Sequence, residues 1–320
     1  MSEYDLLSTY ISCKTAPAVN MSNYGIANLQ QATSHWRSCA GGVVRAHSLL
    51  YEEMKNHPSF SGFISEMKGI LRGKIEDTDV DSYIKNEPDS NRSLICPTMG
   101  HYKLNIEYNH KVNIGVNYVN LHLYGEDLWD FEYAFDKSFF NNLKNQILPS
   151  MVAGNGRKFS ISYDFNYTVK VEPTYYYILS SINMNYCLDI EGGSQKNEAN
   201  VQIYLKNRTD AQKFSFSKCG DYYYIVCKCS GKVIDVKHSG KDPGTNIWQY
   251  ELNKTHAQQW KIEKGKTWTF YSRVNGLCLD LNSSGTYNGN NIHCWSPNNT
   301  NAQKFYVFDT NSILGLLFGV

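Results

Sequence analysis

The second half of the chain carries an internal repeat, and this repeat restricts the fold more than any other feature. Three aspartates, Asp189, Asp235 and Asp280, lie 46 and 45 residues apart. Each is followed by an aromatic residue at plus 15, Asn at plus 18, Thr at plus 20, Ala-Gln at plus 22 and 23, and a second aromatic at plus 25. Because the register has no internal gap, we expect each copy to be one structural unit.

Each copy contains short apolar runs separated by Gly, Asn and Ser, a pattern typical of β-strands joined by turns. Tyr222–Val226 and Thr267–Tyr271 are examples. Units this short must pack on one another to bury a core. Three propeller blades are too few to close a ring, so the repeat favours a compact barrel of three lobes.

The copies share a Gln-x-aromatic signature, which stands as Gln212-Lys213-Phe214, Gln258-Gln259-Trp260 and Gln303-Lys304-Phe305. This signature, at this repeat length, resembles that of the ricin B-type lectins over about residues 174 to 310. The resemblance implies a β-trefoil fold in which each lobe can hold one sugar, usually galactose or N-acetylgalactosamine. An early Asp and a later aromatic would hold that sugar, while the aromatic after Gln belongs to the core.

Transferred position by position, the resemblance implies three sets of carbohydrate-binding residues. The first set is Asp189, Gln202, Tyr204, Asn207 and Gln212; the second is Asp235, Trp248, Tyr250, Asn253 and Gln258; the third is Asp280, His293, Trp295, Asn298 and Gln303. These residue types suit sugars, because a carboxylate accepts two hydroxyl hydrogen bonds, an amide donates and accepts, and a ring covers a pyranose face. The plus-13 residue is Gln in the first copy, Trp in the second and His in the third, so we expect the lobes to differ in sugar binding. Asp and Asn also cap turns, which is the structural alternative.

Cysteine spacing, charge and hydropathy exclude several other classes of protein. The 31 Lys and Arg balance 30 Asp and Glu, which argues against a nucleic-acid partner. No apolar run reaches the ~18–20 residues of a membrane span, and Met1–Asp5 does not begin a classical signal peptide. The 9 Cys match no metal-site spacing, and neither a P-loop nor a dinucleotide motif occurs. We therefore expect no metal or cofactor, a glycan partner, and action outside or at the surface of a cell through another export route. The family's intra-lobe disulfide is not expected, because Lys206, Leu252 and Pro297 stand where the second cysteine usually lies.

The first half predicts an α+β domain of residues 1–172, followed by the β-trefoil domain of residues 173–320. Residues 23 to about 86 show helical periodicity in three stretches, at residues 23–36, from Val44 to Met54 and from Phe60 to Leu71. The period then becomes two at 102–108, 112–118 and 159–171, which predicts antiparallel strands. Residues 136–148 predict one more short helix.

Three functional readings of the first half stay open beside a lectin-targeted effector of unknown activity. Cys39 before a possible helix start and His101 on a strand faintly resemble the nucleophile and base of papain-like and NlpC-type hydrolases. The long alternating strands suit either a half-buried sheet or a pore-forming toxin with a transmembrane hairpin. Finally, His122, Glu126, Asp127, Asp130 and Glu132 offer acid–base or metal chemistry, although a solvated turn is the default.

Overall fold

A computed structural model of the chain describes residues 43–45, 48–86, 92–96, 100–129 and 159–312. These residues divide into two compact units. The first is drawn from Met1–Gly69, Lys85–His110 and Val119–Val169, and the second from Ile70–Ile84, Lys111–Tyr118 and Lys170–Val320. Two short stretches of the first half therefore pack with the C-terminal half. The domain boundary at residues 172 and 173 stays a prediction from sequence.

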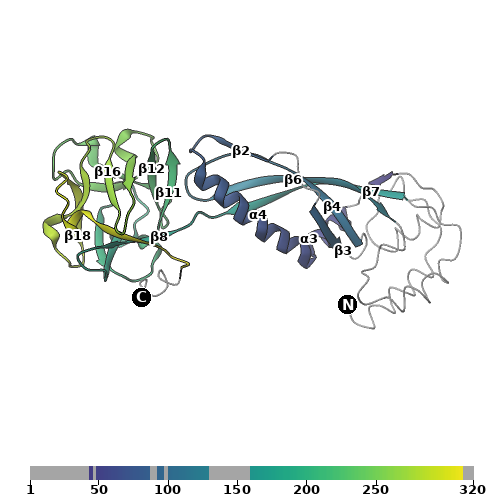
Figure 1. Ribbon diagram of the computed structural model, residues 1–320, viewed down its shortest axis with the longest axis horizontal. Coiled ribbons are helices and arrows are strands. Elements are labelled where there is room, and N and C mark those ends of the chain that lie inside the picture. Colours follow the sequence, from purple (N-terminus) through teal and green to yellow (C-terminus); the bar gives the residue numbers. More distant parts are fainter. Residues whose placement is uncertain (1–42, 46–47, 87–91, 97–99, 130–158, 313–320) are drawn as a thin grey trace. The chain divides into compact units, whose positions relative to one another are not determined.

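The first unit is built on a five-stranded sheet with the order β1-β7-β6-β4-β3 (Figure 1). Its strands are β1 (Val43–Arg45), β3 (Arg92–Cys96), β4 (Gly100–Glu107), β6 (Asn117–Trp129) and β7 (Phe159–Val171). β4 runs antiparallel to β3 and β6, whereas β1 runs parallel to β7. A separate pair joins β2 (Tyr83–Lys85) to β5 (Asn109–Lys111).

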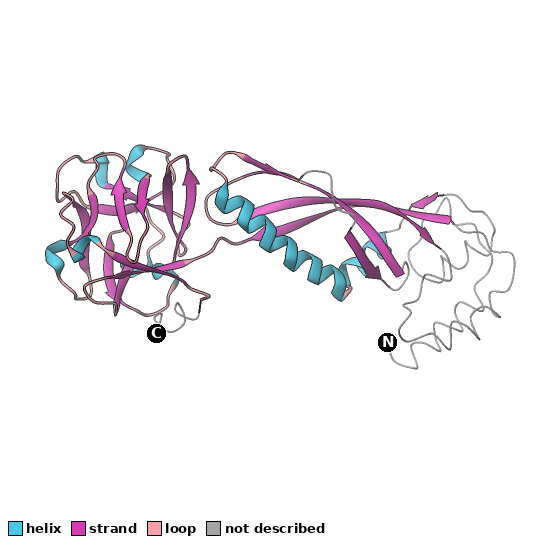
Figure 2. Cartoon of the chain, in the orientation of Figure 1, coloured by secondary structure: helices cyan, strands magenta, loops and turns pink. Residues whose placement is uncertain are grey.

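Two helices precede most of these strands, α3 (Ser48–Asn56) and α4 (Pro58–Asp77) (Figure 2). The ring of Phe60 on α4 lies 6.3 Å from Phe165 and 5.1 Å from Tyr167 of β7. The apolar side chains of β7 that alternate with polar ones are buried, among them Ile161, Tyr163 and Phe165. The predicted order of helices followed by strands is confirmed, and the alternation in β7 follows from packing on one face of the sheet.

Two local predictions are wrong. Val44, assigned to a helix, lies in β1, where it is opposite Ile161 of β7. The run from Val112 to Tyr118 is not one strand, because a turn separates β5 from β6. Gly115 has a φ of 65°, and the Asn117 amide donates to the carbonyls of Asn113 and Gly115 at 3.0 and 3.1 Å. A side chain that satisfies the turn backbone competes successfully with strand pairing. The predicted helices at residues 23–36 and 136–148 lie outside the described residues.

The C-terminal half contains three lobes of four strands each. The first has β8 (Tyr176–Ser180), β9 (Tyr186–Ile190), β10 (Val201–Leu205) and β11 (Phe214–Cys219); the second has β12 (Tyr222–Cys227), β13 (Val233–Val236), β14 (Ile247–Tyr250) and β15 (Trp260–Glu263); the third has β16 (Thr269–Ser272), β17 (Cys278–Leu281), β18 (Asn290–Trp295) and β19 (Phe305–Asp309). The first and last strands of the lobes pair in a continuous series, within a lobe (β8 with β11, β12 with β15) and between lobes (β11 with β12, β15 with β16). β19 returns to β8, and a bridge between Trp268 and Phe305 closes the ring. This is the predicted β-trefoil.

The plus-25 aromatics, Phe214, Trp260 and Phe305, are fully buried in a single apolar cluster that all three lobes share. The Ala at plus 22, which lies in a short 3₁₀ turn, joins them in each lobe. The repeat signature is therefore the interior of the barrel, as predicted. It fixes the position of the strands that carry the candidate site residues.

Residues 77–82 and 111–114 pack within the second unit against β11 and β12, where the first lobe meets the second. Val80 donates its backbone N–H to the carbonyl of Lys218 at 2.9 Å. Val80 and Ile114 also cover a cluster of Tyr224, Val226 and Val233.

An exposed carboxylate completes this contact. Asp81 forms ion pairs with Lys111, at 2.9 Å, and with Lys254 of the second lobe. The hydrogen bonds from Lys111 and Lys254 lower the pKa of Asp81.

Candidate functional site

Each lobe places its aspartate opposite the plus-13 residue of the next strand. Asp189 of β9 is paired with Gln202 of β10, and the same register joins the two residues in the other lobes. Gln202 donates to Asp189 Oδ1 at 3.0 Å, and the Trp248 indole N–H donates to Asp235 Oδ1 at 2.9 Å. Asp280 Oδ1 lies 3.2 Å from Nε2 of His293. One geometry therefore fixes the carboxylate with three different partners.

The aspartates are buried, and burial changes their chemistry. All three are 5% exposed. Burial raises the pKa of Asp189, against hydrogen bonds from Gln202 and Gln212 that favour the ionised form. Burial raises the pKa of Asp235 likewise, opposed by hydrogen bonds from Trp248 and Gln258. Since an ionised carboxylate in such a site has unused lone pairs, these groups are suited to accept hydrogen bonds from ligand hydroxyls.

The asparagine, threonine and glutamine of the repeat form one hydrogen-bonded turn. In the first lobe the Asn207 backbone N–H donates to Gln212 Oε1 at 2.9 Å, and Gln212 Nε2 donates to the carbonyl of Leu205 at 3.0 Å. Asn207 Oδ1 accepts from the backbone and hydroxyl of Thr209 at 3.0 and 2.7 Å. The same bonds occur in the second and third lobes.

The residues of this turn have different roles. The glutamines are buried, so they hold the turn and the aspartate in position rather than face solvent. Each asparagine uses its oxygen within the turn, which leaves the amide N–H₂ as the group it can offer a ligand. The predicted set therefore divides into residues that position the site and residues that can contact a sugar.

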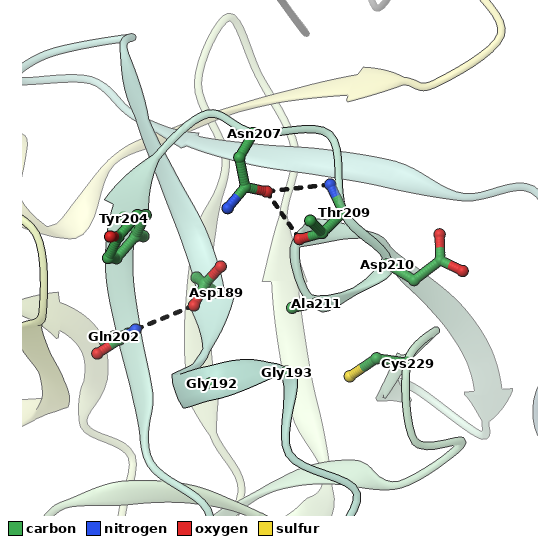
Figure 3. A pocket seen from close by; sticks show the side chains of 10 residues that line it. All are labelled: Asp189, Gly192, Gly193, Gln202, Tyr204, Asn207, Thr209, Asp210, Ala211 and Cys229. Carbon is green, nitrogen blue, oxygen red and sulfur yellow. Dashed lines mark hydrogen bonds between the residues drawn. The ribbon is translucent and has the colours of Figure 1, made fainter.

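Four predicted residues of the first lobe come together around an open depression of about 470 Å³ (Figure 3). The lining consists of Asp189, Gly192, Gly193, Gln202, Tyr204, Asn207, Thr209, Asp210, Ala211 and Cys229. Tyr204 stands on the rim and is 37% exposed, so its ring offers a face to solvent. The arrangement combines an acceptor, an amide donor and a flat apolar surface in one place.

The second lobe arranges the corresponding residues differently. Trp248 is 6% exposed, as Gln202 is in the first lobe, but the ring of His238 meets it edge-on at 5.0 Å. Lys237 Nζ lies 5.3 Å from the Trp248 ring, and Tyr250 stacks beside it at 6.1 Å. Side chains of this lobe therefore cover the residue that binds the aspartate.

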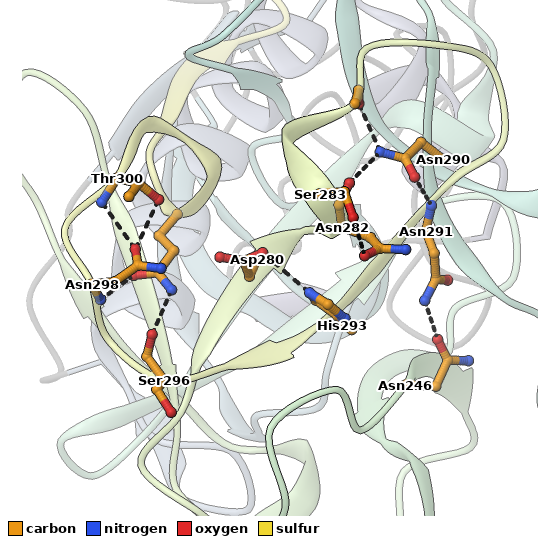
Figure 4. Close-up of polar contacts among 12 residues, drawn as sticks. Asn246, Asp280, Asn282, Ser283, Asn290, Asn291, His293, Ser296, Asn298 and Thr300 are labelled. Atoms are coloured by element: carbon orange, nitrogen blue, oxygen red, sulfur yellow. Dashed lines mark hydrogen bonds and ion pairs between the residues drawn. The ribbon is translucent and has the colours of Figure 1, made fainter.

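The third lobe keeps an exposed aromatic beside its aspartate. Trp295 is 41% exposed and stacks on His293 with ring centroids 5.3 Å apart. Figure 4 shows His293 reaching Asp280, with Asn298 and Thr300 forming the turn on the other side. Carboxylate, ring and amide are thus brought together here as in the first lobe.

Two sets of residues were not anticipated from the repeat. Gly192 and Gly193 line the first depression with positive φ, and His238, Ser239, Ser283 and Ser284 have the same backbone at plus 3 and 4. Asn200, Asn246 and Asn291 form a closed ring, each amide donating to the next residue's Oδ1 at 2.8 to 3.0 Å. Figure 4 shows the Asn291–Asn246 bond. The signal for the ring was present, since Asn recurs at plus 11 in every copy.

The candidate sites of the first half are only partly described. Cys39, Asp130 and Glu132 lie outside the described residues, and His101 lies on β4 opposite Ile95. His122 is on β6, not in a turn, and its ring nitrogens lie 3.0 Å from Asp164 and 3.5 Å from Glu107. The hydrogen bond to Asp164 is the main reason that the pKa of His122 is raised.

The described part of the chain offers neither a metal site nor a membrane-spanning helix. Its residues include no His, Cys, Asp and Glu group arranged to hold a metal ion, and no helix long and apolar enough to cross a membrane. The cysteines between residues 187 and 294 are free thiols, which agrees with the absence of cysteine at the family's usual partner positions.

Comparison with known proteins identifies the C-terminal half. Residues 174–308 match the family model described as the ricin-type beta-trefoil lectin domain. Residues 174–308 therefore constitute a ricin-type β-trefoil lectin domain, and such a domain binds carbohydrate. No curated protein matches the chain.

Three solved structures illustrate the likeness. The designed three-fold symmetric protein ThreeFoil is 27% identical, with 42% of this chain and 98% of that chain covered and a TM-score of 0.41. The Polyporus squamosus lectin, bound to a human-type influenza-binding epitope, is 21% identical over 42% of this chain and 49% of that chain, with a TM-score of 0.38. The C-half of the earthworm R-type lectin, in complex with GalNAc, is 21% identical over 43% and 99%, with a TM-score of 0.36.

Proposed function

We propose that the lectin domain binds galactose-type glycans, with galactose or N-acetylgalactosamine as the recognised sugar, through up to three lobes. The observation that carries this proposal is the first-lobe depression, where buried Asp189 faces the same space as Tyr204 and the Asn207 amide. The axial hydroxyl of galactose leaves one apolar C–H face for an aromatic ring and presents two neighbouring hydroxyls to a carboxylate. Open, wet sites of this kind gain strength when several lobes engage one clustered surface.

A glycan array with the full chain tests this proposal. The triple variant Asp189→Asn, Asp235→Asn, Asp280→Asn keeps the size of each side chain and its ability to accept from the plus-13 residue, but removes the negative charge. We expect the parent to bind galactose-terminated glycans and the triple variant to lose them. Asp221→Asn, on an exposed turn, is the matched control. Unchanged binding by the triple variant would show that these aspartates are not the sugar site.

We further propose that the lectin domain targets an N-terminal effector region to glycosylated surfaces outside the cell that makes it. Support comes from the continuity of the second unit, in which residues 77–82 and 111–114 pack on β11 and β12, where the first and second lobes meet. A cysteine hydrolase with Cys39 and His101, and a pore-forming toxin, are the alternatives for that region. Loss of a hydrolytic activity in Cys39→Ser would support the first, and dye release from glycolipid vesicles would support the second.

A further inference from the structure

Two positions of the repeat separate the first lobe from the second. The residue three after the aspartate is Gly192 in the first lobe, His238 in the second and Ser283 in the third. The residue thirteen after it is Gln202, Trp248 and His293. We propose that these two positions decide which lobes are open to a glycan, so that the first lobe is open and the second is closed by its own side chains. This inference rests on the proposed function, because it names the lobes that carry it out.

The first lobe is open because its aspartate lines a depression that receives no side chain from the plus-3 position. Gly192 has a φ of 63°, and a Cβ added there would meet no atom within 4 Å. The depression of about 470 Å³ includes this position. The Gln202 N–H₂ group donates to Asp189, and its Oε1 can accept a hydrogen bond from a sugar hydroxyl.

The second lobe has the same backbone but carries an imidazole ring at the corresponding position. His238 has a φ of 52°, close to that of Gly192, so its side chain leaves the chain from the equivalent point. Its ring packs edge-on against Trp248, whose indole N–H is directed to Asp235. An indole donates and cannot accept, so the plus-13 position here offers a ligand no acceptor. Asp235 itself is 5% exposed, as Asp189 is, so the two lobes differ in the groups that surround the carboxylate rather than in its burial.

The rim of the second lobe is also engaged. Lys254 follows Asn253 directly, and its ammonium group is paired with Asp81. Leu252, on the other side of Asn253, packs on the cluster that Val80 and Ile114 cover. The turn that presents a sugar-contacting amide in the first lobe therefore serves an intrachain contact in the second. The second lobe combines an imidazole ring against its plus-13 residue with an occupied rim.

The third lobe resembles the first at the plus-3 position. Ser283 is small, has a φ of 52°, and donates its hydroxyl to Asn282 at 3.1 Å. Trp295 beside the aspartate is 41% exposed. The third lobe is therefore expected to stay open, and it must be silenced before the first two are compared.

The test uses the full chain with Asp280→Asn as background, so that only the first and second lobes contribute. The probe is an immobilised polymer that carries galactose or N-acetylgalactosamine, read by surface plasmon resonance. Gly192→His places in the first lobe the side chain that closes the second, on a backbone that His238 already adopts. We expect binding to weaken by about tenfold or more, whereas Asp235→Asn in the same background changes it by less than about twofold.

The reverse exchange provides a gain of function. His238→Gly with Trp248→Gln should open the second lobe and raise apparent affinity for the polymer several-fold, because two sites can then engage it. If the loss of buried Trp248 prevents folding, as a thermal melt would show, His238→Gly alone removes only an exposed side chain and should give a smaller gain. Ser283→Gly in the silenced third lobe is the matched control and should have no effect.

Three outcomes separate this inference from the proposed function. Full binding by Gly192→His would overturn it, as would a loss in Asp235→Asn equal to the loss in Asp189→Asn. Absence of binding by the unaltered chain to any galactose-type probe would instead overturn the proposed function. Weaker binding with Gly192→His together with stronger binding with His238→Gly supports both.

Discussion

The first and second lobes of the β-trefoil share a backbone and a hydrogen-bond pattern but not a surface. Asp189 and Asp235 are equally buried, and Gln212 and Gln258 make the same bonds in the same turn. The lobes differ where Gly192 and Gln202 are replaced by His238 and Trp248. The comparison teaches that recurring polar residues hold the architecture, whereas those that change between copies determine what each lobe can bind.

The largest expected effect is a loss of stability when the plus-25 aromatic, present in every lobe, is removed. Trp260 is fully buried in the shared cluster, and its replacement by Ala should lower the free energy of unfolding by about 3–5 kcal/mol, through lost burial and the cavity left behind. Phe214→Ala and Phe305→Ala should cost amounts in the same range. Urea unfolding measures all three. A cost confined to one lobe would contradict the view that the three aromatics form one core.

The repeated glutamine should come next. Gln258→Ala removes the bonds to the Asn253 N–H and the Glu251 carbonyl and leaves both groups without them. We expect a loss of about 1–3 kcal/mol, and a similar loss for Gln212→Ala. Thermal melts followed by circular dichroism check both. If only Gln212→Ala mattered, the turn would be a first-lobe feature rather than a common one.

Substitution of the aspartates should affect glycan binding differently in the two lobes and should lower stability in neither. Asp189→Asn is expected to weaken glycan binding by about tenfold or more, and Asp235→Asn by less than about twofold. Neither should lower the melting temperature, since burial raises the pKa of each carboxyl and removal of the charge relieves that cost. Titration against a galactose polymer and a melt of each variant are the measurements. Equal losses of binding would remove the distinction between the lobes.

The same shift predicts how binding depends on pH. The pKa of Asp189 in the folded chain lies above its ordinary value of 3.8, so protonation begins at a higher pH than for an exposed aspartate. Glycan binding should therefore weaken as pH falls through that raised pKa, while the contribution of Asp189 to folding stability improves over the same range. Asp189→Asn should bind weakly with no such pH dependence. Binding that is constant down to the ordinary value would contradict the burial of this carboxylate.

The smallest effect is expected at the rim of the second lobe. Asp81 has a φ of 70°, which Asn also tolerates, so Asp81→Asn removes the ion pairs with Lys111 and Lys254 without backbone strain. Because the pair is exposed, the loss should stay below about 1 kcal/mol and shrink further at high salt. Melts at two salt concentrations check this. A larger, salt-independent loss would point to packing by Val80 and Ile114 instead.

The sequence predicted the three lobes well because their core depends on spacing. The plus-25 aromatics and the Ala-Gln pair recur without a gap, and periodicity of this kind is visible in one dimension. The roles of Gly192 and His238 were not predictable, because neither residue type signals a site and their effect depends on a left-handed backbone shared by three different residues. The strand predicted at residues 112–118 failed for a related reason, since the Asn117 side chain closes a turn that alternation alone does not reveal.

The ring of Asn200, Asn246 and Asn291 has a consequence for how the three copies behave together. Each amide is donor to one neighbour and acceptor from the other, so the ring has a direction of rotation and no end. Removing any one copy would leave one unmatched donor and one unmatched acceptor at the junction of the remaining two. The rim of each lobe can therefore change independently, whereas the asparagine ring closes only when all three lobes are present.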